Sequence, residues 1–144
     1  MNELEKTDNI NNLYNRIVSL IENAKRNIVK NVNREMTLLY WNIGKDITEN
    51  VLKNEKAEYG KSVIQELSKR LSLNYGAGYG KRNIFRMVKF YGYFSDFEIV
   101  STVSTQLSWS HFVELIQISD NIKREFYTIM CINENWSVRT LRKR

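Results

Sequence analysis

The sequence predicts a mainly α-helical fold, and three observations support this. The 144 residues include no proline, so no residue type in the chain forces a helix to break. Apolar residues recur at three- and four-residue spacing over most of the length, as they do on helices with one buried face. A hydrophobic share of 42% and a charged share of 26% are ordinary for a globular protein. We therefore expect a single helical domain over residues 1–144.

The first segment, residues 9–53, predicts one long kinked helix or two helices in series. Asp8 is the candidate N-cap, because its side chain can accept a bond from a free N–H of the first turn. The apolar residues of this segment form two stripes: Ile10, Leu13, Tyr14, Ile17, Val18, Leu20, Ile21, Ile28 and Val29, then Met36, Leu39, Tyr40, Ile43, Ile47 and Val51. One small core needs less apolar surface than this, so we expect a homodimer through these helices.

Residues 61–94 predict two helices joined by a glycine-rich turn. Gly60 is expected to close the preceding segment, and Ser62 to cap a first helix that ends near Leu73. The turn NYGAGYG supplies residues that tolerate positive φ. A second helix follows over residues 81–94, with Ile84, Met87, Val88 and Tyr91 on its buried face. Because the turn exceeds the usual three or four residues, any helix-turn-helix here is a variant, and the pair could equally be two packed helices with a solvated face.

The remainder of the chain predicts helices after one ambiguous run. Residues 95–106 contain FEIVSTVST, which could form a short strand or hairpin arm and so a small β wing, but no two-residue turn signal decides this. Residues 107–144 return to helical spacing. Ser110, Asp120 and Ser137 are the expected helix caps there.

The formal net charge of +6 concentrates between Lys61 and Tyr93. That window holds seven basic residues against one acid, which equals the net charge of the whole chain. Such a window favours an anionic partner, because Lys and Arg neutralise phosphates while Arg and Asn can bond to guanine and adenine edges. The candidate nucleic-acid-binding residues are Lys81, Arg82, Asn83, Arg86 and Lys89 on the second helix, and Lys69 and Arg70 on the first. The alternative is a solvated helical face without a ligand.

Aromatic residues crowd the same window and allow a second interpretation. Rings interleaved with cations can stack on unpaired bases. In a small domain, however, most rings belong to the core, and this is the interpretation we favour. The rings are Tyr75, Tyr79, Phe85, Phe90, Tyr91, Tyr93 and Phe94.

We expect no catalytic, metal or cofactor site in this chain. The one histidine, His111, follows Ser108 and Ser110, but neighbours in sequence do not make a catalytic triad, so we expect a capping or interface histidine beside Trp109. Cys131 lies among apolar residues and predicts a buried structural thiol. The carboxylates lack the spacing of a magnesium-dependent nuclease. No stretch approaches the roughly 18 apolar residues of a membrane helix, so we expect a cytoplasmic protein with no membrane partner.

Six motifs, taken in order, resemble the N-terminal domain of the YhcG family. They are LYWNIG (39–44), YGKSVIQELSKRLS (59–72), GYGKRNIFRMVKFY (78–91), LSWSHFVEL (107–115), REFY (124–127) and WSVRTL (136–141). The similarity runs from about Leu13 to the last residue. Two positions depart from the family pattern: Gly80 stands where a serine cap is expected, and Ser108 stands where proline is frequent.

The resemblance implies a helical domain, thought to be a DNA-binding helix-turn-helix, that precedes a nuclease domain of the PD-(D/E)xK type. It assigns the basic residues after the glycine turn to DNA binding. The nuclease motif has no counterpart in this sequence, which stops about where the family's linker to the nuclease begins. We therefore expect an isolated domain or a truncated member, not itself an enzyme.

Two functional hypotheses follow from the sequence. The first is a DNA-binding module that targets a PD-(D/E)xK-type nuclease domain or subunit. The alternative is a protein-interaction or dimerisation module with no direct nucleic-acid contact. The two differ in salt dependence, because phosphate contacts weaken steeply with added salt whereas an apolar helix interface changes little.

Overall fold

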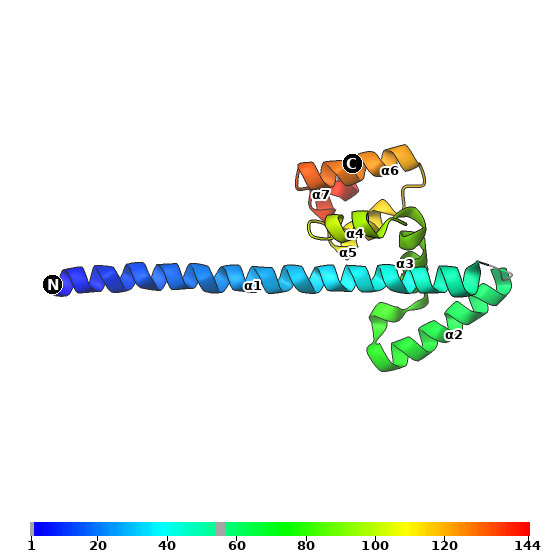
Figure 1. The fold of residues 1–144 in the computed structure, drawn as a ribbon, viewed down its shortest axis with the longest axis horizontal. Coiled ribbons are helices and arrows are strands. Elements are labelled where there is room, and N and C mark those ends of the chain that lie inside the picture. The colour runs from blue at the N-terminus through cyan, green and yellow to red at the C-terminus, as the bar shows by residue number, and fades with distance from the viewer. Residues whose placement is uncertain (1, 54–56) are drawn as a thin grey trace. The chain divides into compact units, whose positions relative to one another are not determined.

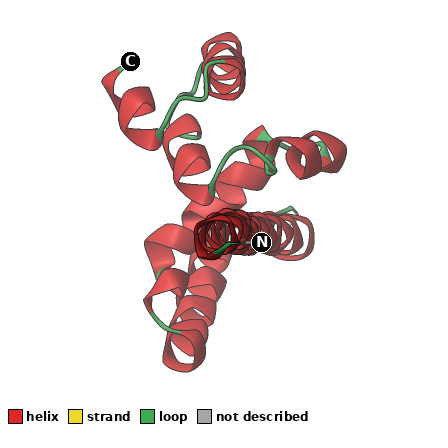
Figure 2. Cartoon of the chain, turned by 90° about the vertical axis from the view of Figure 1, so that its left-hand side faces the viewer, coloured by secondary structure: helices red, strands yellow, loops and turns green. Residues whose placement is uncertain are grey.

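The computed structural model describes residues 2–53 and 57–144 (Figure 1). Every regular element within these residues is a helix, and none is a strand (Figure 2). The prediction of a mainly α-helical fold is therefore confirmed. The chain divides into two compact units, Met1–Asn33 and Arg34–Arg144. None of the helices in the described ranges combines the length and apolar character needed to cross a membrane.

The first unit is helical and belongs to α1 (Glu3–Ile47). The prediction that Asp8 caps this helix was wrong, because the helix already begins at Glu3. Asn2 supports this start, since its side chain accepts a 2.8 Å hydrogen bond from the Glu5 backbone N–H. Two acids in the first turn, Glu3 and Glu5, also favour a helix start there. The large apolar side chains of this unit are exposed: Leu4, Ile10, Leu13, Tyr14, Ile17, Val18, Leu20, Ile21, Ile28, Val29 and Val32.

In the second unit α1 continues to Ile47 as one helix, so the alternative of two helices in series was wrong, and it passes into a π-helical turn, Thr48–Leu52. The Trp41 indole N–H donates a 2.6 Å hydrogen bond to the Phe94 carbonyl. The Arg34 guanidinium donates to the Ser101 hydroxyl at 2.8 Å. These bonds attach residues 34–47 to the segments around Phe94 and Ser101.

The predicted pair of helices is present as α2 (Ala57–Tyr75) and α3 (Lys81–Tyr93), joined by a 3₁₀ turn, Ala77–Tyr79. Gly76, at φ +93°, supplies the left-handed conformation that starts the turn. Gly60 and Ser62 lie inside α2, so the predictions that they end and cap helices were wrong. Gly60 is instead a packing residue, since a Cβ there would lie 2.5 Å from the Leu52 side chain.

Helix α3 joins the two clusters of buried side chains in the second unit. The first cluster contains Trp41, Phe90, Val100, Leu107, Phe112, Leu115, Ile116, Cys131 and Leu141. The second contains Tyr40, Ile47, Ile64, Ile84 and Met87. Ile84 and Met87 are buried as predicted, but the third buried residue of α3 is Phe90, while Val88 and Tyr91 are half-buried. One face of α3 is thus fixed in the core, and the opposite face is left to solvent.

The run considered as a strand is helix α4 (Phe97–Val103). Asp96 caps it by accepting a 3.0 Å hydrogen bond from the Glu98 backbone N–H, and Val100 packs into the core. The strand alternative was therefore wrong, and the described residues form no β wing.

Three further helices complete the unit: α5 (Trp109–Leu115), α6 (Asn121–Asn133) and α7 (Val138–Lys143). Asp120 and Ser137 cap α6 and α7, as predicted. Ser110 is not a cap, because it lies inside α5 and Ser108 takes that position.

Candidate nucleic-acid interface

The cations on α3 lie away from its core-facing side chains. Lys81, Arg82 and Lys89 are exposed, and Arg86 is half-buried. The helix contains no acidic residue, and its N-cap, Gly80, brings no side chain. Nothing on α3 itself therefore neutralises these charges.

Three of these cations share a shallow cavity between α3 and α5, which we call the α3–α5 groove. Its volume is about 390 Å³. The groove is lined by Arg82, Phe85, Arg86, Lys89, Val113, Ile116 and Gln117. No acidic side chain is among these residues, so the groove offers positive charge beside an apolar wall.

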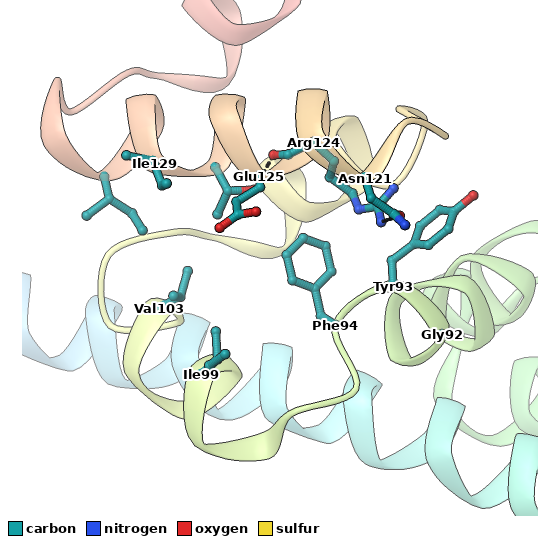
Figure 3. A pocket seen from close by; sticks show the side chains of 11 residues that line it. Gly92, Tyr93, Phe94, Ile99, Val103, Asn121, Arg124, Glu125 and Ile129 are labelled. Carbon is teal, nitrogen blue, oxygen red and sulfur yellow. Dashed lines mark hydrogen bonds between the residues drawn. The ribbon is translucent and has the colours of Figure 1, made fainter.

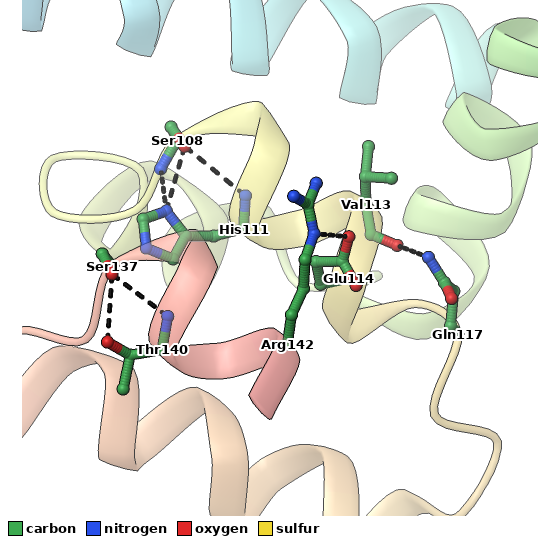
Figure 4. Close-up of polar contacts among 8 residues, drawn as sticks. All are labelled: Ser108, His111, Val113, Glu114, Gln117, Ser137, Thr140 and Arg142. Carbon is green, nitrogen blue, oxygen red and sulfur yellow. Dashed lines mark hydrogen bonds and ion pairs between the residues drawn. The ribbon is translucent and has the colours of Figure 1, made fainter. Parts of the chain in front are cut away.

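The groove cations are not used to hold the fold together. Within the described chain, neither the Arg82 nor the Arg86 guanidinium has a hydrogen-bond or ion-pair partner. The Lys89 ammonium lies 5.7 Å from the Tyr93 ring centroid, a weak exposed contact. Arg142 shows the contrast, because its guanidinium donates a 2.7 Å bond to Glu114 (Figure 4). Arg82 and Arg86 are thus available for an external anion.

Other predicted site residues do not line this groove. The Asn83 amide donates a 2.6 Å hydrogen bond to the Gly78 carbonyl and accepts a 3.3 Å bond from the Trp109 indole, so both of its ends hold the turn and α5 in place. Arg70 pairs with Glu66 at 3.2 Å on the surface of α2. Lys69, Arg70 and Lys81 are exposed but lie outside the groove lining.

Sequence reasoning missed the apolar residues of the groove. Phe85 was grouped with the rings expected in the core, and Val113, Ile116 and Gln117 were not assigned to the site. The spacing gave no usable signal for Phe85, since Phe85 and the fully buried Phe90 both fall outside the i, i+3, i+4, i+7 set expected on the buried face of α3. The contribution of α5 had no local signal, because it arises from a tertiary contact.

His111 has the capping role that was predicted for it (Figure 4). Its Nδ1 accepts a 3.1 Å hydrogen bond from the Ser108 backbone N–H, while the Ser108 hydroxyl accepts from the His111 N–H at 3.4 Å. Nε2 lies 2.8 Å from the Trp136 carbonyl, which can only accept, so Nε2 carries the proton. Both ring nitrogens are therefore engaged in holding α5 and the segment before α7.

A larger cavity, of about 530 Å³, lies among the end of α3, α4 and α6 (Figure 3). Its one arginine, Arg124, stacks over the Tyr93 ring at 3.8 Å and donates a 2.6 Å hydrogen bond to the Ile118 carbonyl. The Glu125 carboxylate also lines this cavity. With its cation already bound and an acid present, this cavity suits a polyanion less well than the α3–α5 groove does.

Cys131 and the possible metal-binding side chains form no other candidate site in the described residues. Cys131 is buried in the core as predicted, and this burial raises the pKa of its thiol, which favours the unreactive protonated form. Within the described ranges, no three His, Cys, Asp or Glu side chains gather closely enough to hold a metal ion.

Comparison with known proteins gives a family and one curated relative. The family described as the DUF1016 N-terminal domain matches residues 16–144. The protein named "Putative nuclease YhcG" of Escherichia coli (strain K12) is 29% identical over 161 residues, covering 91% of this chain. The chain spans only 43% of the length of that relative. No solved structure gives a significant match. The similarity predicted from the six motifs is thereby confirmed, and the chain belongs to the DUF1016 N-terminal domain family.

Proposed function

We propose that this domain binds DNA through the α3–α5 groove and positions a nuclease domain on it. One observation carries the proposal: Arg82, Arg86 and Lys89 gather on one face with no acid beside them. Arginine presents a planar fork of N–H donors that matches phosphate oxygens in pairs. These two arginines and the Lys89 ammonium, along one helix, suit a row of backbone phosphates.

The arrangement of the two helices supports the same proposal. We assign α3 the role of the second helix in a variant helix-turn-helix, with α2 and the Ala77–Tyr79 turn before it. In this role Arg82 and Lys81, near the start of α3, approach the DNA first. The Asn83 amide supports the turn instead of reading a base, since both of its ends are already bonded.

The nuclease part of the proposal comes from the relative. That relative is named "Putative nuclease YhcG", and this chain matches less than half of its length. We assign binding to the present domain, and hydrolysis to a PD-(D/E)xK-type nuclease domain or subunit outside it.

The first test is direct binding of a short fluorescein-labelled DNA duplex to the purified chain. Phosphate-dominated, sequence-independent binding has a Kd of about 1 to 100 µM at physiological salt, and we expect a value in that range from fluorescence anisotropy. Several duplexes of unrelated sequence should give similar values. Absence of binding at about 100 µM protein would remove the proposal.

A second candidate function, interaction with another protein chain, is favoured by the first unit. Its helix exposes a row of large apolar side chains, among them Leu13 (50% exposed), Ile17 (44%) and Ile21 (47%). Exposed apolar rows of this kind more often form an interface with another chain than stay in contact with solvent. The partner we propose is the same helix of a second copy, because residues three and four apart on this stripe suit pairing of two helices.

Light scattering of the purified chain tests this dimer. We expect twice the chain mass of 17.1 kDa, and we expect the double change Ile17→Asp and Ile21→Asp to give the monomer, since two carboxylates per chain would enter the apolar interface. The matched control, Asn12→Asp with Asn15→Asp, adds the same charge on the polar side of the helix and should stay dimeric. A monomeric wild-type chain at high micromolar concentration would contradict the dimer.

A further inference from the structure

Phe85 is an aromatic residue placed among the cations of α3 and not used by the aromatic core. Its side chain is 37% exposed and lines the α3–α5 groove together with Arg82, Arg86 and Lys89. In the described part of the chain Phe85 makes no ring–ring or cation–ring contact. Phe90 differs, because it is fully buried and its ring centroid lies 4.6 Å from that of Phe112. The core therefore gives no reason for a ring at position 85.

The surroundings of Phe85 suit a flat, partly polar group attached to a phosphate. Val113 of α5 and Ile116, at the C-cap of that helix, continue the apolar wall, and the groove volume of about 390 Å³ falls within the range of sites for small molecules. The Gln117 side-chain amide, two residues beyond the end of α5, donates a 3.2 Å hydrogen bond to the Val113 carbonyl of α5. An aromatic face beside several cations is the usual arrangement for holding a nucleotide by its base and its phosphate.

The pairing state of the base decides whether it can reach this ring. In duplex DNA both faces of each base are covered by the neighbouring base pairs, whereas an unpaired base can leave the stack and lie on an aromatic side chain. Phe85 has nothing to stack on in a regular duplex. It gains a partner only where the DNA contains unpaired nucleotides.

We propose that Phe85 stacks on an unpaired base, so that the α3–α5 groove prefers DNA in which single-stranded nucleotides adjoin a duplex. This inference rests on the proposed function, because the groove cations must first hold the backbone. It adds the substrate class: junctions, tails or flaps, in place of regular duplex. Stacking of one base on an aromatic side chain contributes roughly 5- to 150-fold in affinity, so the preference should be measurable.

The test compares two labelled DNAs, a blunt duplex and the same duplex with a single-stranded tail of thymidines, in anisotropy titrations with the full chain. Wild-type protein should bind the tailed DNA at least fivefold more tightly. Phe85→Leu keeps an apolar side chain of similar size without a π face, and it should bind both DNAs with the affinity of the blunt duplex. Phe85→Trp should keep the preference. Thermal melts of each variant confirm that it is folded.

Tyr75→Ala is the matched control, because Tyr75 is another exposed ring, at 73%, but lies outside the groove lining. This variant should keep the wild-type preference. Equal binding of the two DNAs by wild type would overturn the inference and leave duplex binding intact. A preference that survives Phe85→Leu would overturn it too, since an apolar contact would then suffice. Failure of wild type to bind either DNA would instead remove the proposed function.

Discussion

Replacing Arg82, Arg86 and Lys89 together with Ala is expected to weaken duplex binding on the order of 100-fold at about 0.15 M salt. Each phosphate contact changes the logarithm of the affinity by about 0.9 per decade of salt, which amounts to roughly fivefold per contact at this concentration. Loss of all three contacts therefore lowers the affinity on the order of 100-fold. The fold should be retained, because these side chains face the groove and solvent while Ile84, Met87 and Phe90 hold α3 in the core.

The control for this variant removes the same charge from another part of the second unit. Lys123, Arg139 and Lys143 are exposed on α6 and α7, and none of the three lines the α3–α5 groove. Their joint replacement with Ala should lower the affinity only slightly, through the change in net charge. Equal losses in the two triple variants would mean that DNA is attracted by the total charge and not by the groove.

Gly44→Ala is expected to destabilise the domain by about 3 kcal/mol or more, which is a large part of the roughly 5 to 15 kcal/mol that stabilises a typical domain. Gly44 is the last residue of the LYWNIG motif, at a point where α1 approaches the backbone of α3. A Cβ there would lie 2.0 Å from the Met87 carbonyl oxygen and 2.6 Å from its carbonyl carbon. Backbone atoms in a helix cannot turn aside as a flexible side chain can, so the two helices must separate.

Gly92→Ala serves as the matched control. Gly92 also lies inside a helix, α3, but a Cβ there would meet no atom within 4 Å. Since Ala is favoured over Gly in a helix by about 1 kcal/mol, this variant should be neutral or slightly stabilised. Urea unfolding followed by circular dichroism measures both changes. A Gly44→Ala protein as stable as the wild type would show that α1 and α3 do not pack this closely.

The sequence predicted those elements whose signals are local. Helix α3 was predicted over residues 81–94 and spans Lys81–Tyr93. The prediction was close because the glycine-rich turn ends where the row of apolar residues and the run of cations begin. Asp120 and Ser137 were correctly predicted as caps, since a cap acts within one turn. The prediction that Ser62 caps a helix was wrong, because α2 already begins at Ala57, before the apolar residues on which the prediction rested.

Other predictions were decided by tertiary packing. The β-branched residues of 97–103 have strand propensity, but the Asp96 cap and burial of Val100 favour a helix there. Phe85 and Phe90 looked alike in sequence, yet one is 37% exposed and the other fully buried. The cations of the site were predicted from charge alone, whereas the apolar wall from α5 depends on how that helix packs against α3.

The most direct test of the central claim is the salt dependence of duplex affinity, measured for the wild-type chain and for the Arg82→Ala, Arg86→Ala, Lys89→Ala variant. If these three side chains neutralise phosphates, a plot of log affinity against log salt should be steep for the wild type. The slope of the variant should be smaller by about 2.7, or about 0.9 for each lost contact. Parallel lines for the two proteins, or a wild-type affinity that does not change with salt, would contradict a nucleic-acid site in the α3–α5 groove.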